Sequence, residues 1–384
     1  MKTMYQMLLS AALLWSAPAL AQDTMTLFAA DGDRITADGA VTFAIVGNTR
    51  ASIAADGASG RSAASKGVPE AIFADIAAAE PEFLVMMGDH VRSGKKGDYK
   101  KFAKAAAPIA GLKVVPVVGD HESLKDPRLE QWAATYPGAG ADIGFNRVGS
   151  WMWFDIKSEG HIYRFVVLDT NKDALGSRWN EQVSWLPSAL EGRFDSLFVF
   201  SHHPTLELGG REPQMNPGGV PVELMDMIEE RVDLNKVRAM FSAGTHTSAV
   251  LRPDGPFGQL WIGAGGGGAP GEDLSRWYYA EAAERNQDVS LEPLYDVSIL
   301  NALKYWADEH PVPEPVMEQA RADGAFEGFR GIVEARHMPT YGWFSVTLDG
   351  DSVRVSFRHH LPDGKIEQRY AIAFSSERGW VPGL

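Results

Sequence analysis

The sequence predicts an α/β fold in which helices cover stacked strands, and two observations indicate it. Through the first two thirds of the chain, short β-branched or apolar runs alternate with segments of helical pattern. This alternation is typical of βαβ units. Several of the apolar runs are also followed directly by polar residues, as expected where a ligand site forms at the carboxyl ends of strands.

The first predicted strand is the apolar run Val41–Val46. A helix with a proline near its start follows at Pro69–Ala79 and leads into a second strand, Phe83–Met87. Another helix, Tyr99–Ala110, leads into a third strand, Val114–Val118. These segments have the order of consecutive βαβ units.

The middle of the chain continues the alternation. Two strands are predicted on either side of the polar stretch 157–161, where Gly160 can adopt the positive φ of a tight turn. Helical and strand patterns then follow one another up to residue 242. In order, the predicted elements are the strands Trp151–Ile156 and Ile162–Leu168, the helix Gln182–Leu190, the strand Leu197–Phe200, the helix Val222–Val232 and the strand Val237–Ser242.

The last third of the chain has a different composition. One more strand, Gln259–Gly263, is followed by four glycines and then by residues 272–337, whose Trp, Tyr, Glu and Ala content predicts a helical insertion. C-terminal strands are predicted over residues 341–374. They comprise a β-hairpin of Gly342–Leu348 and Val353–Arg358, turning at Asp349-Gly350-Asp351, and a further strand at Ile366–Phe374.

The N-terminus has the pattern of a secretory signal peptide. Lys2 precedes the apolar run Met7–Leu14, and the small-residue sequence Ala19-Leu20-Ala21 then resembles a cleavage site. The apolar run is shorter than the roughly 20 residues that a membrane-spanning helix needs. Residues 1–21 are therefore predicted to be a signal peptide and residues 22–384 one domain that is periplasmic or secreted, with no transmembrane segment.

Charge argues against a nucleic-acid partner. The chain has 36 Lys and Arg residues against 50 Asp and Glu residues, and the formal net charge is −14. Nucleic-acid binding depends on clustered basic side chains that neutralise phosphates, which an acidic chain does not supply. We interpret the scattered acidic residues as a solubilising surface.

Five short segments place polar residues just past an apolar strand, so their side chains are expected to converge at one site. Carboxylate, imidazole and amide groups gathered in this way suit divalent ions such as Mn, Fe or Zn, which polarise a phosphoryl oxygen and lower the pKa of a bound water to about 7. The segments are Gly47-Asn48-Thr49-Arg50, Gly88-Asp89-His90, Gly119-Asp120-His121-Glu122, Ser201-His202-His203-Pro204 and Ser242-Ala243-Gly244-Thr245-His246-Thr247.

The order and spacing of these segments resemble the motifs of the calcineurin-like metallophosphoesterase family. That family has an Asp-containing first motif, then Gly-Asp, Gly-Asn-His-Asp/Glu, a lone His and Gly-His-x-His. The resemblance spans about Val41–Gly268 and includes the terminal hairpin. It implies a four-layer α/β/β/α sandwich and hydrolysis of phosphate mono- or diesters with one or two bound metal ions, so the partner would be a phosphorylated small molecule or another phosphoester.

The family's roles fall on particular positions of this chain. Asp89 matches the carboxylate that bridges two metal ions, and His202 matches an imidazole ligand, although His203 could take that role instead. His121 matches the histidine that contacts the substrate phosphate and protonates the leaving group, and Glu122 would orient it. The alternative for each histidine motif is a solvated loop or strand end.

Three positions depart from the family's pattern. Asn48 stands where the family has a metal-binding Asp, and Asp120 stands where it has an Asn, so the number of carboxylates is unchanged. A metal ion could still be held by Asp89, Asp120 and His202. Arg50 replaces a histidine, and its guanidinium could pair with a phosphate in a bidentate manner; the alternative is an ordinary surface arginine.

The last motif departs furthest. Both ligand histidines of Gly-His-x-His are threonines, Thr245 and Thr247, and only the spacer His246 is a histidine. A one-residue shift of the loop would aim His246 at the metal. Without that shift, the chain is expected to hold one metal ion or none.

Three further interpretations concern the cleft and its surroundings. The glycines 265–268 either cradle a phosphate or allow a tight chain crossing, but a phosphate loop of the nucleotide-binding kind would also need a following helix and lysine. The insertion 272–337 is a candidate lid over the site. As an alternative to hydrolysis, the chain would be a catalytically inactive relative that binds a ligand or an envelope protein.

Overall fold

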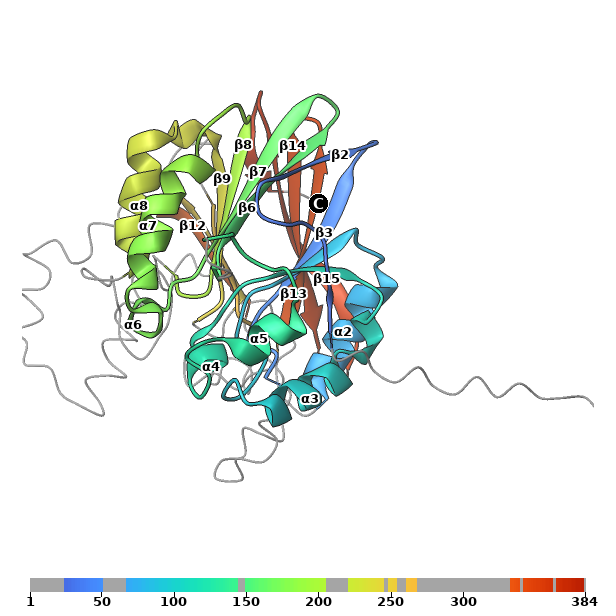
Figure 1. The fold of residues 1–384 in the computed structure, drawn as a ribbon. Helices are drawn as coiled ribbons and strands as arrows, with labels where there is room; N and C mark the ends of the chain where they lie inside the picture. The colour runs from blue at the N-terminus through green and yellow to red at the C-terminus, as the bar shows by residue number, and fades with distance from the viewer. Residues whose placement is uncertain are drawn as a thin grey trace, which may run out of the picture.

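The structure is a computed structural model, and it describes residues 24–50, 67–143, 149–204, 220–244, 248–253, 260–267, 332–338, 341–361 and 364–382. These residues form two eight-stranded sheets that face each other, and helices lie on the outer sides (Figure 1). The predicted α/β fold class is confirmed. None of the helices in the described residues is long and apolar enough to span a membrane.

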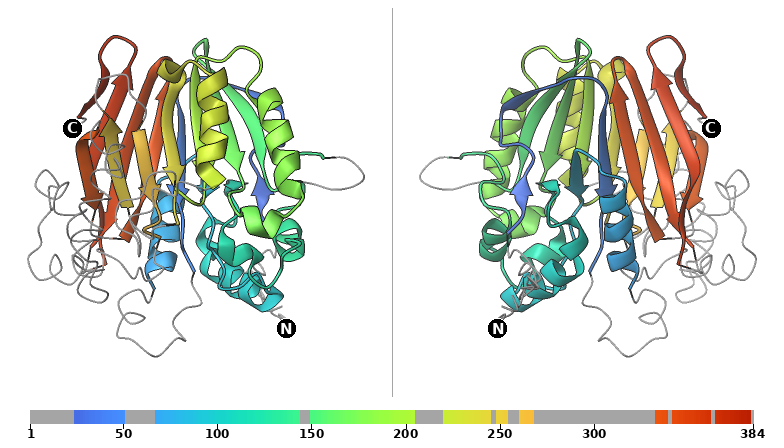
Figure 2. Two further views of the ribbon diagram at one scale, coloured as in Figure 1. Left: turned by 90° about the vertical axis from the view of Figure 1, so that its left-hand side faces the viewer. Right: turned by 90° about the vertical axis from the view of Figure 1, so that its right-hand side faces the viewer.

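The first sheet combines a parallel half with an antiparallel half. The parallel strands include the first three predicted from the sequence, and the antiparallel strands are C-terminal and lie side by side in both views of Figure 2. The order is β1 (Thr26–Leu27), β5 (Lys113–Pro116), β4 (Phe83–Met86), β3 (Val41–Val46), β13 (Tyr341–Asp349), β14 (Ser352–His360), β15 (Ile366–Ser375) and β16 (Gly379–Pro382).

The second sheet has a parallel centre formed by β7, β8, β9 and β11. On one side of this centre, β6 pairs antiparallel with β7, and β2 pairs parallel with β6 at the edge. On the other side, β10 pairs antiparallel with β11, and β12 pairs antiparallel with β10. The order is β12 (Ile332–Met338), β10 (Ser248–Pro253), β11 (Leu260–Ala264), β9 (Val237–Ser242), β8 (Ser196–Ser201), β7 (His161–Leu168), β6 (Met152–Ser158) and β2 (Asp33–Ala37).

The helices fall into two groups, one for each sheet. Side chains of α2, α3 and α5 pack with one face of the first sheet, and those of α7 and α8 pack with one face of the second. The bounds are α2 (Val68–Ala78), α3 (Lys96–Ala105), α4 (Asp120–Ser123), α5 (Glu130–Thr135), α6 (Lys172–Leu175), α7 (Arg178–Ala189) and α8 (Val220–Arg231), with 3₁₀ turns η2 (Ala107–Ile109) and η3 (Leu234–Lys236).

The main core lies between the two sheets and is rich in phenylalanine. The ring centroid of Phe43 lies 4.8 Å from that of Phe83 in the same sheet and 5.4 Å from that of Phe165 in the other. These edge and stacked contacts add to the free energy gained by burying the rings. They hold the two sheets, and therefore their loop-bearing edges, in one arrangement.

An ion pair fixes the C-terminal strands to the first helix layer. The guanidinium of Arg358 on β14 donates to both carboxylate oxygens of Asp75 on α2, each at 2.7 Å. The indole N–H of Trp343 donates to the same carboxylate at 2.8 Å. This link ties the last third of the chain to the βαβ units.

Two predicted elements need correction. The predicted helix Tyr99–Ala110 ends as α3 at Ala105 and continues as the turn η2, because Pro108 has no N–H for a further helical bond. The helical pattern predicted up to His337 does not hold at its end, since Ile332–Met338 is strand β12, which pairs with β10. Residues 272–331 of the predicted insertion lie outside the described residues, as do residues 1–21.

Candidate active site

Four of the five predicted segments place side chains where strands from both sheets end, and Ala243 and Gly244 of the fifth contact them through backbone groups. Asn48 follows β3, Asp89 follows β4, Asp120 begins α4 after β5, and His202 follows β8 in the other sheet. Because β3, β4 and β5 run parallel, their carboxyl ends share one edge of the sheet. The loops after them can therefore bring polar side chains together, as the sequence predicted.

Glycine is required where two of these loops touch. Gly88 has a φ of +86°, and a Cβ on it would lie 2.6 Å from the backbone nitrogen of Gly119 and 2.7 Å from Nδ1 of His202. Those separations are shorter than atoms tolerate, so any other residue would push the loops apart. Gly88 therefore sets the close approach of the Asp89 loop to Asp120 and His202.

Asp89 is the centre of the cluster and is almost completely buried. Its Oδ1 accepts a hydrogen bond from the backbone N–H of His121 at 3.1 Å and lies 3.4 Å from Nε2 of His202. Its Oδ2 lies 3.7 Å from Nε of Arg50. The two carboxylate oxygens thus face different partners.

His202 presents one ring nitrogen to two carboxylates. Its Nδ1 donates to the backbone carbonyl of Met87 at 2.8 Å, which leaves Nε2 to face the site. That Nε2 lies 3.3 Å from Oδ1 of Asp120 and 3.4 Å from Oδ1 of Asp89. Anchoring one ring nitrogen on a carbonyl is how proteins orient histidine as a metal ligand.

The charges of this cluster are strongly coupled. Burial alone would lower the pKa of His202, but the nearby carboxylates of Asp89 and Asp120 raise it to about 9. The side chain of Asp120 is 53% exposed. Its partial desolvation would raise its pKa, whereas its hydrogen bond and charge interaction with His202 lower that pKa overall. Without a metal ion, a proton on His202 compensates the carboxylates; a divalent cation binding there would displace it.

Two overlapping sets of side chains have ligand atoms within 4.8 Å of one another: Asp120 with His202 and His203, and Asp89 with Asp120 and His121. His203 also lies at this edge, with its Nδ1 2.8 Å from Oγ1 of Thr170. Burial, and then the charge of His202, lower the pKa of His203 to about 4. Its imidazole is therefore neutral, which is the form that binds metal ions.

His121 and Arg50 form a contacting pair. Nδ1 of His121 contacts the carbonyl oxygen of Arg92, so this nitrogen carries the proton and Nε2 accepts a hydrogen bond from Nη1 of Arg50. Arg50 is only 8% exposed. The alternative of an ordinary surface arginine is therefore wrong.

The predicted role of Glu122 needs correction. Its carboxylate accepts hydrogen bonds from the backbone N–H groups of Asp89 (2.8 Å), His90 (2.8 Å), Val91 (3.4 Å) and Gly119 (2.9 Å). These bonds hold the Asp89 and Asp120 loops together. Glu122 thus orients backbone rather than the ring of His121, which Arg50 and the Arg92 carbonyl contact instead.

The comparisons with known proteins rest on structure. Neither a known family model nor a curated protein matches the chain by sequence. PhoD matches with a TM-score of 0.55 at 12% identity, covering 92% of this chain and 73% of that one. A purple acid phosphatase from yellow lupin, Lupinus luteus, matches with a TM-score of 0.52 at 14% identity. The chain has the calcineurin-like metallophosphoesterase fold.

The match to the lupin phosphatase covers 88% of this chain but only 54% of that protein. GAP50 of Plasmodium has the same fold, with a TM-score of 0.52 at 11% identity over 87% of this chain and 88% of that one. At these identities the likeness defines the metallophosphoesterase fold and leaves the chemistry to the residues of the site.

Asn48 follows β3 after one intervening residue, and its Oδ1 has no hydrogen-bond partner among the described residues. Its Nδ2 donates to the carbonyl oxygen of Ala243, whereas this Oδ1 is buried. A buried oxygen without a donor is costly, and a cation or water at the cluster would satisfy it. The residues present, two carboxylates, imidazoles and this amide oxygen, fit a divalent metal ion.

One predicted ligand and part of the glycine run cannot be placed. His246, together with Thr245 and Thr247, lies outside the described residues, and so does Gly268. Gly267 lies beside the first motif, because its N–H donates to the carbonyl oxygen of Gly47 at 3.0 Å and a Cβ on it would lie 2.1 Å from that oxygen. This supports the chain-crossing interpretation of these glycines.

Sequence reasoning gave no role to His90, which stabilises the site. His90 is buried, accepts from the backbone N–H of Gly88 through Nε2 at 3.1 Å, and contacts Oγ1 of Thr49 through Nδ1 at 2.7 Å. The position of His90, next to Asp89 after the strand, was the only available signal. Because Nε2 accepts, His90 is neutral and links the first and second motifs.

Because unfolding lets His90 take up a proton in mild acid, we expect the free energy of unfolding of the metal-free protein to fall there. Burial lowers the pKa of His90 to about 4, below its unfolded value near 6.5. Its stabilising contribution is therefore complete above pH 6.5 and is lost as the pH falls towards 4, by about 3 kcal/mol. Protonation of Nε2 of His90 would also destroy its hydrogen bond with Gly88, because two N–H groups would then face each other.

The measurement is the unfolding free energy in denaturant, with chelator, at several pH values. His90→Gln should be less stable than the wild type at pH 7 but should lose less stability between pH 6.5 and 4. Equal pH slopes for the two proteins would show that His90 is not the titrating group.

Proposed function

We propose that the chain is a metal-dependent hydrolase of phosphate mono- or diesters. The observation that carries this proposal is the position of Nε2 of His202, 3.3 Å from Asp120 and 3.4 Å from Asp89, where loops of the two sheets meet. An imidazole and two carboxylates form a ligand set suited to Mn, Fe or Zn. The metallophosphoesterase fold, shared with PhoD and a purple acid phosphatase, supports the same conclusion.

A bound divalent ion supplies Lewis-acid polarisation of a phosphoryl oxygen and lowers the pKa of water. The chain's own residues supply the rest. Asp89, Asp120 and His202 hold the ion. The guanidinium of Arg50 would bind phosphate oxygens. The Arg92 carbonyl holds Nδ1 of His121, and Nε2, once it has taken up a proton from water and released its bond to Arg50, would donate that proton to the leaving-group oxygen.

Turnover of generic phosphomonoester and phosphodiester reporters tests this proposal. The wild-type chain, reconstituted in turn with Mn, Fe and Zn, should hydrolyse at least one reporter class, and chelator should stop it. Asp89→Ala and His121→Ala should each lower kcat/KM at least about a hundredfold, equivalent to about 2.7 kcal/mol of transition-state stabilisation.

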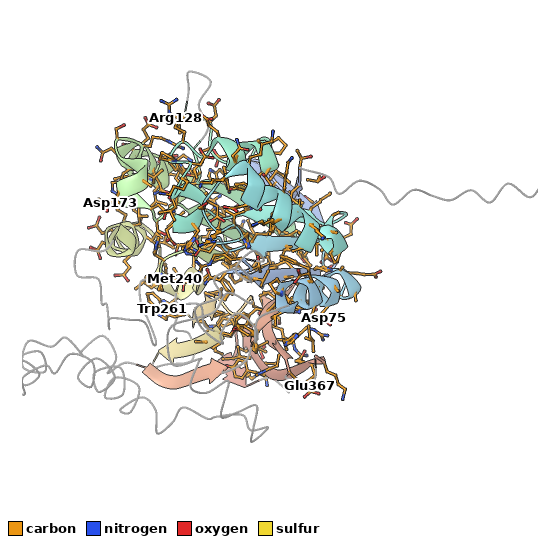
Figure 3. The ribbon with its side chains drawn as sticks, turned by 90° about the horizontal axis from the view of Figure 1, so that it is seen from below. Asp75, Arg128, Asp173, Met240, Trp261 and Glu367 are labelled. Carbon is orange, nitrogen blue, oxygen red and sulfur yellow. The ribbon has the colours of Figure 1, made fainter. Side chains whose placement is uncertain are left out.

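The exposed Asp173 on α6, labelled at the periphery in Figure 3, provides a matched control for Asp89. Asp173→Ala should leave turnover unchanged. Metal-dependent turnover that persists in both Asp89→Ala and His121→Ala would refute the assignment of the site.

A second candidate is a binding protein without catalysis. Asn48 in the place of an Asp favours it, as does the shared fold with GAP50, which is described as the anchor in the inner membrane complex of Plasmodium. In that case the cleft or the insertion 272–337 would bind a ligand or an envelope protein. Wild-type protein that binds metal but hydrolyses no reporter would favour this candidate, whereas chelator-sensitive turnover would exclude it.

We also propose that the protein is exported to the periplasm or beyond. The support is the signal-like sequence of residues 1–21, with its cleavage-like site at Ala19-Leu20-Ala21. N-terminal sequencing of protein recovered from the periplasmic fraction should begin at Gln22. An intact Met1 on protein recovered only from the cytoplasm would contradict export.

A further inference from the structure

The two candidate ligand sets are not equivalent, because Arg50 touches only one of them among the contacts of the described residues. In the set of Asp89, Asp120 and His121, Nε of Arg50 lies 3.7 Å from Oδ2 of Asp89, and Nη1 donates to Nε2 of His121. A guanidinium therefore faces two of the three ligands in that set.

The other set is formed by Asp120, His202 and His203. There the ring of His202 is fixed by its 2.8 Å bond to the carbonyl of Met87, and that of His203 by Oγ1 of Thr170 at 2.8 Å. Oδ1 of Asp89 lies on this side, 3.4 Å from His202. The orientation of these groups is set by neutral partners, the Met87 carbonyl and the Thr170 hydroxyl, so a cation that displaces the proton of His202 meets no guanidinium among their contacts in the described residues.

The two carboxylate oxygens of Asp89 thus face different groups. Oδ1 faces the His202 set and Oδ2 faces Arg50. A second divalent ion on Oδ2 would meet the guanidinium at close range, and like charges in a buried site repel strongly. Arg50 is 8% exposed, so it has little room to move into solvent.

We propose that the guanidinium of Arg50 takes the place of a second metal ion, so that the chain holds one ion, on Asp120, His202 and His203 with Asp89, and binds a phosphate group between that ion and Arg50. This proposal rests on the proposed function and specifies its site. Arg50 both compensates Oδ2 of Asp89 and offers the planar N–H pair that matches two phosphate oxygens. The donor bond to His121 places this N–H pair beside the proposed proton-exchanging group.

The first test is the number of metal ions per chain. The purified full chain is saturated with Mn²⁺, and separately with Zn²⁺, freed of excess ion, and analysed for its elements. One ion per chain is expected. Two ions per wild-type chain, or none, would overturn the proposal.

The second test is the affinity of the Mn²⁺-loaded full chain for inorganic phosphate, measured by titration calorimetry. Arg50→Gln should bind phosphate at least about tenfold more weakly and keep one ion, because its amide removes the charge. Arg50→Lys, which keeps the charge but not the planar pair, should lose less affinity. Arg128→Gln, at the periphery in Figure 3 and 85% exposed, should match the wild type within about twofold.

These outcomes separate the two proposals. Unchanged phosphate affinity in a folded Arg50→Gln protein would overturn the role of Arg50, even if reporter esters are hydrolysed. Two ions with turnover would leave the hydrolase intact and refute the single-ion site. One ion with Arg50-dependent phosphate binding, but no hydrolysis of any reporter, would support the single-ion site and refute the hydrolase. Thermal melts of each variant establish that it is folded.

Discussion

Replacing His202 by alanine is expected to remove the bound metal ion and to lower phosphoester turnover at least about a thousandfold, equivalent to about 4 kcal/mol. The side chain is fully buried, and its Nε2 lies within 3.4 Å of both Asp89 and Asp120. Without the imidazole, the site loses its best-oriented nitrogen ligand, and the carbonyl of Met87 loses its donor. The remaining groups, Asp89, Asp120 and His203, then offer a single imidazole, which suits Zn less well.

Metal content after dialysis and turnover of the reporter esters measure this effect. The matched control is His161→Ala, because His161 is a half-buried histidine on β7 that bonds Ser196 at 2.9 Å and lies apart from the candidate ligand sets. The control should keep wild-type metal content and turnover. A His202→Ala protein that retains its metal ion would place the site elsewhere in the chain.

Much of the fold could be predicted because the parallel strands are nearly continuous apolar runs. β3, β4 and β8 are buried along almost their whole length, so apolar residues mark them plainly. β2 was missed because Asp33–Ala37 is a polar edge strand with exposed or half-buried residues. β12 was misread as helical, since Ile332–Met338 contains Glu334, Ala335 and Arg336, which favour helices, and only its pairing with β10 makes it a strand.

The candidate site could be predicted as a set of residues but not as a geometry. Strand ends that share an edge were enough to bring Asp89, Asp120, His121 and His202 together. Which way each side chain points depends on backbone conformation that the sequence does not reveal. Asp89 and Asn48 have positive φ values of 56° and 53°, which non-glycine residues rarely adopt.

Replacing Glu122 by alanine is expected to lower the free energy of unfolding strongly. Its carboxylate is 2% exposed and accepts four backbone N–H bonds that join the loop after β4 to the loop after β5. Glu122→Ala would leave these donors without their acceptor, each at a cost of about 1 to 3 kcal/mol. We expect the free energy of unfolding to fall by at least about 4 kcal/mol.

Glu122→Gln separates the charge from the shape of this side chain. The amide oxygen can still accept, but the NH₂ group would face backbone N–H groups. We therefore expect Glu122→Gln to lower the free energy of unfolding, but by less than Glu122→Ala does. Glu130→Ala, at a 65% exposed position on α5, should change the unfolding free energy by less than about 0.5 kcal/mol. Chemical denaturation with chelator present measures all four proteins. If Glu122→Ala unfolds like the Glu130 control, the carboxylate does not hold the two loops, and their positions must instead come from the contact of Gly88 with Gly119.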